Sequence, residues 1–217
     1  MKSICVITAV LASLILASPI MALAQNESSV LVDLRIDRVQ PGDEDKYISL
    51  QADFADALIA ENLGPRDVWL EIGKTAGVFH VISPANESPA ADEPPLPMIT
   101  STERMTLQLY PELTIPPSTG AASEFLTLTY TVVRRDSRDA YFAWVRDHLR
   151  PHLQSAGANG IVFSRVVTEG DTDTWIRASN ANGTNSSSGA DEIRSELVES
   201  SRTIMLRHVP SASVGVD

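Results

Sequence analysis

The sequence predicts an α+β fold in which one structural unit occurs twice, in tandem, along a single chain. Residues 30–86 and 125–182 share the same order of hydrophobic patterns, at an offset of 94 residues that grows to 96 within the predicted hairpin. Residues 103–111 then resemble residues 202–210. Within each copy, several segments alternate apolar and polar residues as strands do, and one has the spacing of a helix. An internal duplication of this kind constrains the architecture before single elements are assigned.

The first 24 residues have the pattern of a secretory signal peptide. Lys2 precedes an apolar run over residues 4–16, and Ala22-Leu23-Ala24 offers small residues at the positions that a signal peptidase reads. The run is too short to span a bilayer as a stable helix, so a membrane anchor is the less favoured alternative. We therefore expect cleavage before Gln25, a periplasmic or secreted protein, and no membrane association after cleavage.

The rest of the chain is acidic and lacks cysteine. The formal net charge is −11 for the whole sequence and −12 without Lys2, which argues against a nucleic-acid partner. Cys5, the only cysteine, leaves with the signal peptide, so neither a disulfide nor a thiolate metal site is expected. A chain of this length can bury a core large enough to be stable without such cross-links.

The first copy, residues 25–110, is predicted to contain four strands and one helix. Every second residue from Val30 to Ile36 is apolar, which is the period of a strand with one buried face. Pro41-Gly42-Asp43 ends this strand and precedes a helix that runs to about Asn62. A hairpin, a proline-rich irregular segment and a last strand complete the copy, over residues 67–73, 77–83, 87–102 and 103–111.

The second copy, residues 125–210, is predicted to repeat this order. Alternation over residues 126–132 indicates its first strand, and a helix follows from Asp136 or Ser137 to Gly157. The other predicted strands span residues 161–167, 173–179 and 202–210.

The segments between and after the strands are assigned from composition. Residues 189–200 have apolar residues at helical spacing after a flexible loop, so a second helix is expected in this copy. The proline-rich residues 111–124 are predicted to link the copies in an extended form. Residues 211–217 are predicted to form a flexible tail.

The order strand, helix, strand, strand, helix, strand is that of the ferredoxin-like unit, whose helices cover one face of its sheet. Two such units can close their open faces against each other. The sequence in this respect resembles the dimeric α/β-barrel superfamily, which includes antibiotic-biosynthesis monooxygenases, stress-responsive barrel proteins, NIPSNAP proteins and EthD-like proteins. The resemblance implies two tandem ferredoxin-like (βαββαβ) repeats that form a pseudo-dimeric α/β barrel in one chain, as a monomer or within a further homo-oligomer.

The helix predicted in the second copy carries two histidines four residues apart, in the stretch FAWVRDHLRPHLQ. On the offset of 94, His148 and His152 take the places of two apolar residues, whereas a neighbouring stripe of the helix stays apolar. The stretch is similar to a helix of EthD-like proteins, in which an aromatic pair is followed by a histidine and then a proline. Trp144, His148 and Pro151 are the matching residues.

Three roles are open for these histidines. They can lie at the edge of a packed helix, bind a ligand or transfer protons at a pocket mouth, or share a metal ion. A metal site is the least favoured, because no third ligand has helical spacing with the pair and most catalytic sites need three. No metal is therefore predicted. Pro151 removes a backbone donor and is expected to kink the helix, which would turn His152 away from His148.

The alternation of the strands also predicts which residues line the barrel. We expect the apolar faces to meet the helices and the other faces to point into the barrel; these other faces carry Asp33, Arg35, Asp37, Glu71, Gln108, Thr127, Thr129, Thr131, Arg165 and Arg207. Glu71 and Arg165 match on the offset of 94, so they are expected near the pseudo-twofold axis. The alternative is that these charged faces meet water or form ion pairs between the copies.

Aromatic and histidine residues of the hairpins were assigned by the same comparison. Apolar walls are expected from Trp69, Phe79, Phe163 and Trp175. His80 and His208 match apolar residues of the other copy, Ile176 and Leu109, and are predicted to be core or edge residues.

No motif of a nucleophilic enzyme, a zinc protease, a phosphate-binding loop or a nucleotide site occurs. The family resemblance implies a small-molecule enzyme that needs no cofactor, such as an oxygenase or isomerase acting on an aromatic or polyketide-like compound. The candidate catalytic residues are then His148, for proton transfer, and Arg165, for anion binding. The candidate ligand-binding residues are Trp144, His152, Arg35, Glu71 and Trp175. The alternatives are a non-catalytic binding or interaction protein and, less favoured, a haem-binding protein.

Overall fold

The computed structural model describes residues 30–61, 65–85, 96–117, 123–168, 171–180 and 196–214. The predicted signal peptide and its cleavage point lie outside these residues. In the described part, eight antiparallel strands form a closed barrel in the order β1-β3-β2-β8-β5-β7-β6-β4. The strands are β1 (Leu31–Val39), β2 (Asp67–Glu71), β3 (Val78–Pro84), β4 (Ile99–Leu109), β5 (Phe125–Arg134), β6 (Ile161–Val166), β7 (Thr172–Asn180) and β8 (Val198–His208).

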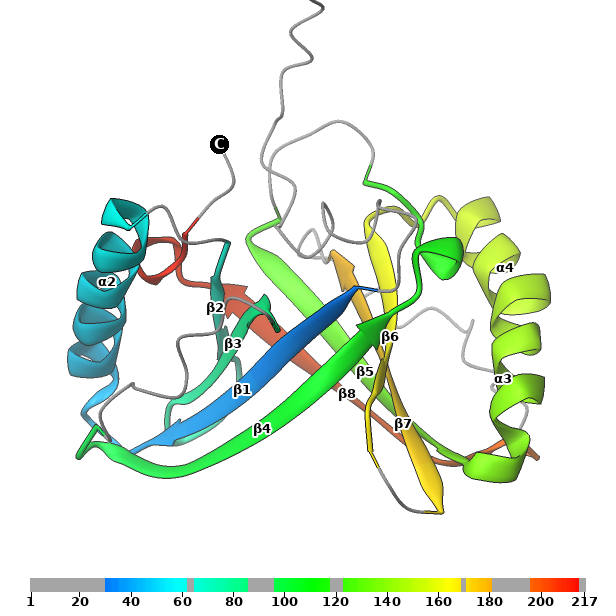
Figure 1. The fold of residues 1–217 in the computed structure, drawn as a ribbon, viewed down its shortest axis with the longest axis horizontal. Helices are drawn as coiled ribbons and strands as arrows, with labels where there is room; N and C mark the ends of the chain where they lie inside the picture. The colour runs from blue at the N-terminus through cyan, green and yellow to red at the C-terminus, as the bar shows by residue number, and fades with distance from the viewer. Residues whose placement is uncertain are drawn as a thin grey trace, which may run out of the picture.

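Helices cover two opposite flanks of this barrel (Figure 1). One flank holds α2 (Glu44–Ala60), and the other holds α3 (Arg138–Trp144) and α4 (Arg150–Ser155), which a π-helical turn over Val145–Leu149 joins into one rod. Single 3-10 turns lie at Pro111–Leu113, Arg135–Ser137 and Pro210–Ala212. No helix in the described part of the chain is long and apolar enough to cross a membrane.

The π-helical turn is the observed effect of Pro151 on the second helix. The Arg150 backbone N–H bonds to the carbonyl of Val145, five residues earlier. Pro151 has no N–H to donate and its ring crowds the carbonyl four residues earlier, so widening the preceding turn lets the helix continue. The helix then runs on to Ser155, and Gly157, at φ +79°, takes the left-handed conformation that ends it.

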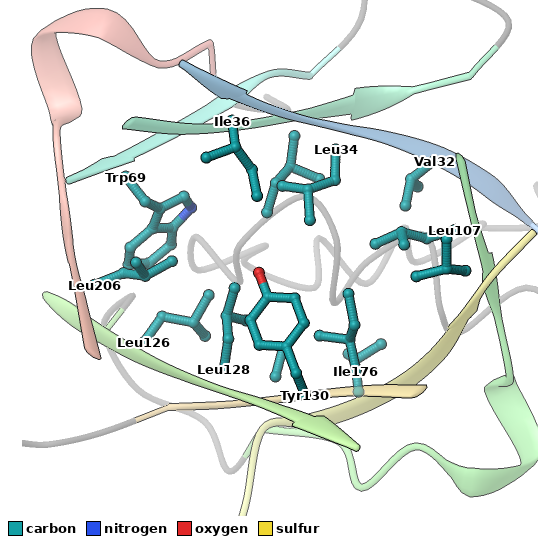
Figure 2. Close-up of a cluster of buried hydrophobic side chains, with 14 of the residues drawn as sticks. Val32, Leu34, Ile36, Trp69, Leu107, Leu126, Leu128, Tyr130, Ile176 and Leu206 are labelled. Atoms are coloured by element: carbon teal, nitrogen blue, oxygen red, sulfur yellow. The ribbon is translucent and has the colours of Figure 1, made fainter. Parts of the chain in front are cut away.

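The barrel interior is apolar, contrary to the predicted orientation of the strands. Figure 2 shows apolar side chains of both copies pointing toward one another inside the barrel; they are Val32, Leu34, Ile36, Trp69, Leu107, Leu126, Leu128, Tyr130, Ile176 and Leu206. The polar residues of β1 face α2 instead, as the hydrogen bond from Tyr47 Oη to Asp37 Oδ2 (2.7 Å) shows. Alternation separates the two faces of a strand, but it does not say which face meets the helices.

The helix predicted over residues 189–200 is wrong in its described part. Residues 196–197 form a turn, and β8 begins at Val198, which pairs with Val133 of β5. Residues 189–195 lie outside the described part. The last strand of the first copy likewise begins earlier than predicted, at Ile99, opposite Val39. Backbone pairing with a neighbouring strand has overridden the local pattern at both places.

Two segments expected to be extended or flexible contact the barrel. Ile115, in the predicted linker, forms a β-bridge with Ile161. In the predicted tail, Val214 is buried and forms a β-bridge with Arg66, with backbone hydrogen bonds of 2.7 and 3.0 Å. Residues 215–217 lie outside the described part.

The strand registers correct one residue match between the copies. β2 meets β8 with Leu70 opposite Arg207, and β4 meets β6 with Gln108 opposite Arg165. The sequence comparison matches Gln108 with Arg207, so these registers align Leu70, and not Glu71, with Arg165. The error of one residue matters because a shift of one places a side chain on the opposite face of the strand.

Candidate functional site

Polar side chains interrupt the apolar lining at one side of the barrel. Trp69 of β2 lies directly opposite His80 of β3 and His208 of β8, and His80 also lies opposite Ile36 of β1. Because paired residues share a face of the sheet, both histidines belong to the interior face together with Trp69. His80 is only 2% exposed.

Glu71 holds the imidazole of His80. Oε2 of Glu71 lies 3.4 Å from Nε2 of His80, and its Oε1 lies 3.3 Å from Nζ of Lys74. The hydrogen bond with His80 lowers the pKa of Glu71 despite partial burial, and Lys74 adds to the effect. Nδ1 of His80 is buried and has no hydrogen-bond partner within the described residues. An imidazole oriented by a carboxylate on one nitrogen, with the other nitrogen open, is the arrangement of a general base.

Tyr130 and Trp69 present further unpaired polar atoms to the interior. The Tyr130 hydroxyl and the Trp69 indole nitrogen are buried, have no hydrogen-bond partner in the described part, and point toward the middle of the barrel (Figure 2). Burial raises the pKa of Tyr130 to about 12; Arg202, whose guanidinium lies 4.6 Å from the ring centroid, opposes this, whereas Glu71 adds to it. The hydroxyl therefore stays protonated at neutral pH and can donate a hydrogen bond.

His208 supports the same side of the barrel. Its ring lies 4.7 Å from the ring of Trp69, and its Nε2 lies 3.6 Å from Oδ1 of Asp67. Buried polar atoms are normally paired, and each exception indicates a water, a ligand or a chemical role. Trp69, Tyr130 and His80 together offer hydrogen bonds inside an apolar wall, which is the usual composition of a small-molecule site.

A cleft of about 410 Å³ lies on the outside, where the β2–β3 hairpin meets β5 and β8. Its lining residues are Glu44, Leu70, Glu71, Ile72, Gly73, Lys74, Ala76, Gly77, Glu124, Phe125 and Arg207. Glu71 thus borders this cleft and also contacts His80 of the interior.

The predicted site arginines lie on the helix side of the sheet, not in the barrel. Arg165 donates to Tyr110 Oη (3.1 Å), Gln108 Oε1 (3.0 Å) and Asp173 Oδ1 (3.3 Å). Arg35 lies 2.9 Å from Asp37 in the first copy. Both guanidinium groups therefore belong to networks that pack a helix onto the outer face of the barrel.

The predicted aromatic residues of the second copy belong to the same helix–sheet packing. Trp175 is 2% exposed and stacks on Tyr110, with ring centroids 5.0 Å apart. Trp144 is half-buried beside Tyr141, at 5.9 Å. Of the predicted aromatic walls, only Trp69 points into the barrel; Phe79, Phe163 and Trp175 lie under the helices.

His148 and His152 are exposed on the outer face of the second helix, and neither borders the cleft. No group of three or more His, Cys, Asp or Glu side chains in the described part could hold a metal ion. The residues do not fit a haem either: these two histidines are at the surface, and His80 and His208 are each beside a carboxylate and Trp69 in the barrel wall.

The structure thus brings together residues that sequence reasoning did not group. Glu71 was a predicted site residue, whereas His80 was predicted to be core, and Tyr130 was read only as an apolar strand residue. A signal was available: in the internal sequence comparison His80 and His208 both match apolar residues, and both lie opposite Trp69.

Comparison with known proteins identifies the fold. No protein-family model and no curated protein matches the chain. Solved structures do match. A "putative monooxygenase" from Lactobacillus acidophilus NCFM has a TM-score of 0.57 at 10% identity, covering 88% of this chain and 100% of its own. An anthrone oxidase-like protein has a TM-score of 0.55 at 11% identity, covering 84% and 92%. A chlorite dismutase from Candidatus Nitrospira defluvii has a TM-score of 0.56 at 10% identity, covering 88% and 95%.

The chain therefore shares the fold of these solved structures. The identities are so low that this likeness concerns the fold alone, because one fold hosts many chemistries. What the chain does must be argued from its own side chains.

Proposed function

We propose that this protein binds a small, largely apolar molecule inside the barrel and holds it by a hydrogen-bond acceptor. The observation that carries this proposal is the group of buried, unpaired polar atoms on Trp69, Tyr130 and His80 within an apolar lining. Indole N–H and phenol O–H groups both donate, so the matching ligand group is a carbonyl or a phenolate oxygen. An aromatic ketone with one such oxygen satisfies the polar atoms and the apolar wall together.

The proposed activity is a monooxygenation that needs no cofactor. One structural neighbour is named a putative monooxygenase and another an anthrone oxidase-like protein. His80, oriented by Glu71, takes a proton from a CH2 group that is conjugated with the ligand carbonyl through an aromatic ring, as in an anthrone. Trp69 and Tyr130 donate hydrogen bonds to the oxygen on which negative charge develops. The resulting carbanion is oxidised by dioxygen, of which one atom becomes a new carbonyl oxygen and the other leaves as water.

We also propose that the barrel arose from two fused ferredoxin-like repeats, which one chain closes as a pseudo-dimer. Exchanging β1, β2, β3 and β4 for β5, β6, β7 and β8 returns the same circular strand order. The bulges match as well, since Val39 and Val133 each follow an interrupted register. If so, a single chain closes the barrel around the proposed interior site, and no second copy of the chain is needed.

Binding in the interior is tested with an anthrone as the probe, followed by calorimetry or Trp fluorescence. Tyr130→Phe and Trp69→Phe are each expected to weaken binding about three- to tenfold, the worth of one buried hydrogen bond between neutral groups. The matched control is Tyr110→Phe, which removes a hydroxyl on the helix side and is expected to bind like the wild type. Equal binding by Tyr130→Phe and the wild type would contradict the interior site.

Extraction of the protein from its native host, followed by mass spectrometry, would identify the natural ligand.

A non-catalytic binding protein is the second candidate. The observation in its favour is that Arg35, Glu71 and Arg165 are all engaged in ion pairs and that apolar side chains fill much of the interior. It predicts ligand binding without oxygen uptake, a difference that the turnover experiment in the Discussion measures.

We propose, from the N-terminal sequence, that the protein is exported to the periplasm or secreted. Intact-mass measurement of the protein from its native host is expected to give a chain that begins at Gln25. A chain that retains residues 1–24 would contradict export by cleavage.

A further inference from the structure

The two seams that join the copies differ at corresponding positions, if the barrel is a fused repeat as proposed above. In the seam between β4 and β6, Arg165 reaches from β6 to Gln108 and Tyr110 on the outer surface. In the seam between β2 and β8, the shorter Leu70 stands in the place of Arg165, and Arg207 stands in the place of Gln108. The cleft of about 410 Å³ lies at this second seam.

Two further exchanges lie beside the cleft. In the second copy, Asp173 accepts hydrogen bonds from Arg138, the first residue of α3 (2.6 and 2.9 Å). The corresponding residues of the first copy are Gly77 and Glu44, the first residue of α2. The Glu44 carboxylate accepts hydrogen bonds from the backbone N–H of Gly42 (2.8 Å) and of Gly77 (3.1 Å). A Cβ at Gly77 would lie 2.7 Å from Cγ of Glu44, so this contact requires glycine.

The charges around the cleft are not all neutralised by the protein. Glu44 is engaged by backbone N–H groups, and Glu71 is engaged by Lys74 and His80. The Arg207 guanidinium and the Glu124 carboxylate both line the cleft, and neither side chain makes a hydrogen bond or an ion pair within the described residues. One cation and one anion are therefore left to meet a ligand.

The rest of the lining supplies an apolar surface. Leu70, Ile72 and Phe125 border the cleft, and the Ile72 side chain is 44% exposed. A guanidinium matches a carboxylate with two parallel hydrogen bonds, and a carboxylate matches an ammonium group.

We propose that the cleft is a second binding site, for a free α-amino acid with an apolar side chain. Arg207 binds its carboxylate, Glu124 binds its ammonium group, and Leu70, Ile72 and Phe125 contact its side chain. A simple carboxylic acid would leave Glu124 facing the bound carboxylate, and a simple amine would leave Arg207 unpaired. A zwitterion is the small ligand that satisfies both groups.

Calorimetry with L-phenylalanine tests this site, with phenylacetate and phenethylamine as the probes that lack one charge each. L-Phenylalanine is expected to bind at least about tenfold more tightly than either probe, because each lost partner is a charge-assisted hydrogen bond. Arg207→Gln, which copies the residue of the other seam, and Glu124→Gln are each expected to weaken binding by about tenfold or more. Both side chains are exposed, so these variants should fold normally.

Further variants separate this site from its alternatives. Leu70→Arg, which places the longer side chain of the other seam in the cleft, is expected to abolish L-phenylalanine binding, with folding checked by circular dichroism. Val167→Ala, at the exposed position of the other seam that corresponds to Ile72, is the control and should bind like the wild type. Tyr130→Phe, which changes only the interior site, should bind L-phenylalanine like the wild type. The result in the cleft is therefore independent of whether the interior binds an anthrone. The proposal would be overturned if L-phenylalanine did not bind, if phenylacetate bound as tightly as L-phenylalanine, or if Arg207→Gln bound L-phenylalanine as tightly as the wild type does.

Discussion

Replacing Asp173 with alanine is expected to lower the free energy of unfolding by about 3 kcal/mol, near the lower end of the cost of breaking a buried charge network. The carboxylate is fully buried, and it contacts Arg138 through two hydrogen bonds and Arg165 at 3.3 Å. Removing it leaves the 13% exposed Arg165 without its counter-charge. The Arg138 side chain is about one third exposed, so water compensates in part for the loss of its ion pair with Asp173. Chemical denaturation at pH 7 measures the effect.

The pH dependence of this difference gives a second measurement on the same variant. Desolvation raises the pKa of Asp173, but the hydrogen bonds and charges of Arg138 and Arg165 outweigh it, so the pKa lies below its ordinary value. The stabilisation is therefore present above the unfolded-state pKa of about 3.9 and is lost as the pH falls through the lower folded-state value. The gap between wild type and Asp173→Ala should narrow below about pH 4.

The control for Asp173 is Asp139→Ala, because Asp139 is an exposed aspartate in the first turn of α3, next to Arg138. A change within about 0.5 kcal/mol is expected there, as for most surface substitutions. A loss of stability at Asp173 no larger than at Asp139 would show that the arginines around Asp173 do not depend on its charge.

The second large effect is expected at His80. With an anthrone as substrate, His80→Gln should reduce the rate of oxygen uptake by about 10²- to 10⁴-fold, the usual contribution of a positioned general base. Glutamine keeps a polar group of similar length beside Glu71 but cannot accept the proton. Ligand binding should change far less than turnover, because Trp69 and Tyr130 still donate to the ligand oxygen.

The matched control is His148→Gln, in which the predicted catalytic histidine on the exposed helix face is replaced in the same way. Oxygen uptake is expected to be unchanged, since the structure places this side chain at the outer surface. Loss of activity in His148→Gln with full activity in His80→Gln would reverse the assignment. Anthrone binding without oxygen uptake by the wild type would instead favour the non-catalytic binding protein.

Much of the fold was accessible from the sequence because it depends on local pattern. The alternation over residues 30–36 and 126–132 marked β1 and β5, and the spacing around Tyr47 and Tyr141 marked the helices that pack on them. Pro151 and Gly157 located the distortion and the end of the second helix. These features need only the chain's own geometry, so neighbouring elements did not alter them.

The candidate site was less accessible, because it depends on which residues meet across strands. Glu71 was predicted to lie with Arg165 near the pseudo-twofold axis, but Arg165 lies on the helix side of the sheet, and Glu71 contacts His80. The sequence match of Glu71 to Arg165 was off by one residue. Because successive residues of a strand point to opposite faces of the sheet, such a shift assigns a side chain to the wrong face. The pair His148 and His152 was predicted from its spacing, from the internal comparison and from the resemblance of its helix to one of EthD-like proteins, none of which shows whether a side chain lines a pocket.

The sequence by itself determined the number, order and type of most elements, together with two polar substitutions, His80 and His208, in otherwise apolar positions. The tertiary structure alone decided that the apolar faces of the strands form the barrel interior and that residues 198–200 pair as a strand. It alone also placed Glu71, His80, Trp69 and Tyr130 around one interior region. The reason is physical: periodicity is a property of one segment, whereas the direction of a face and the partner of a side chain are fixed by registers between strands distant in sequence.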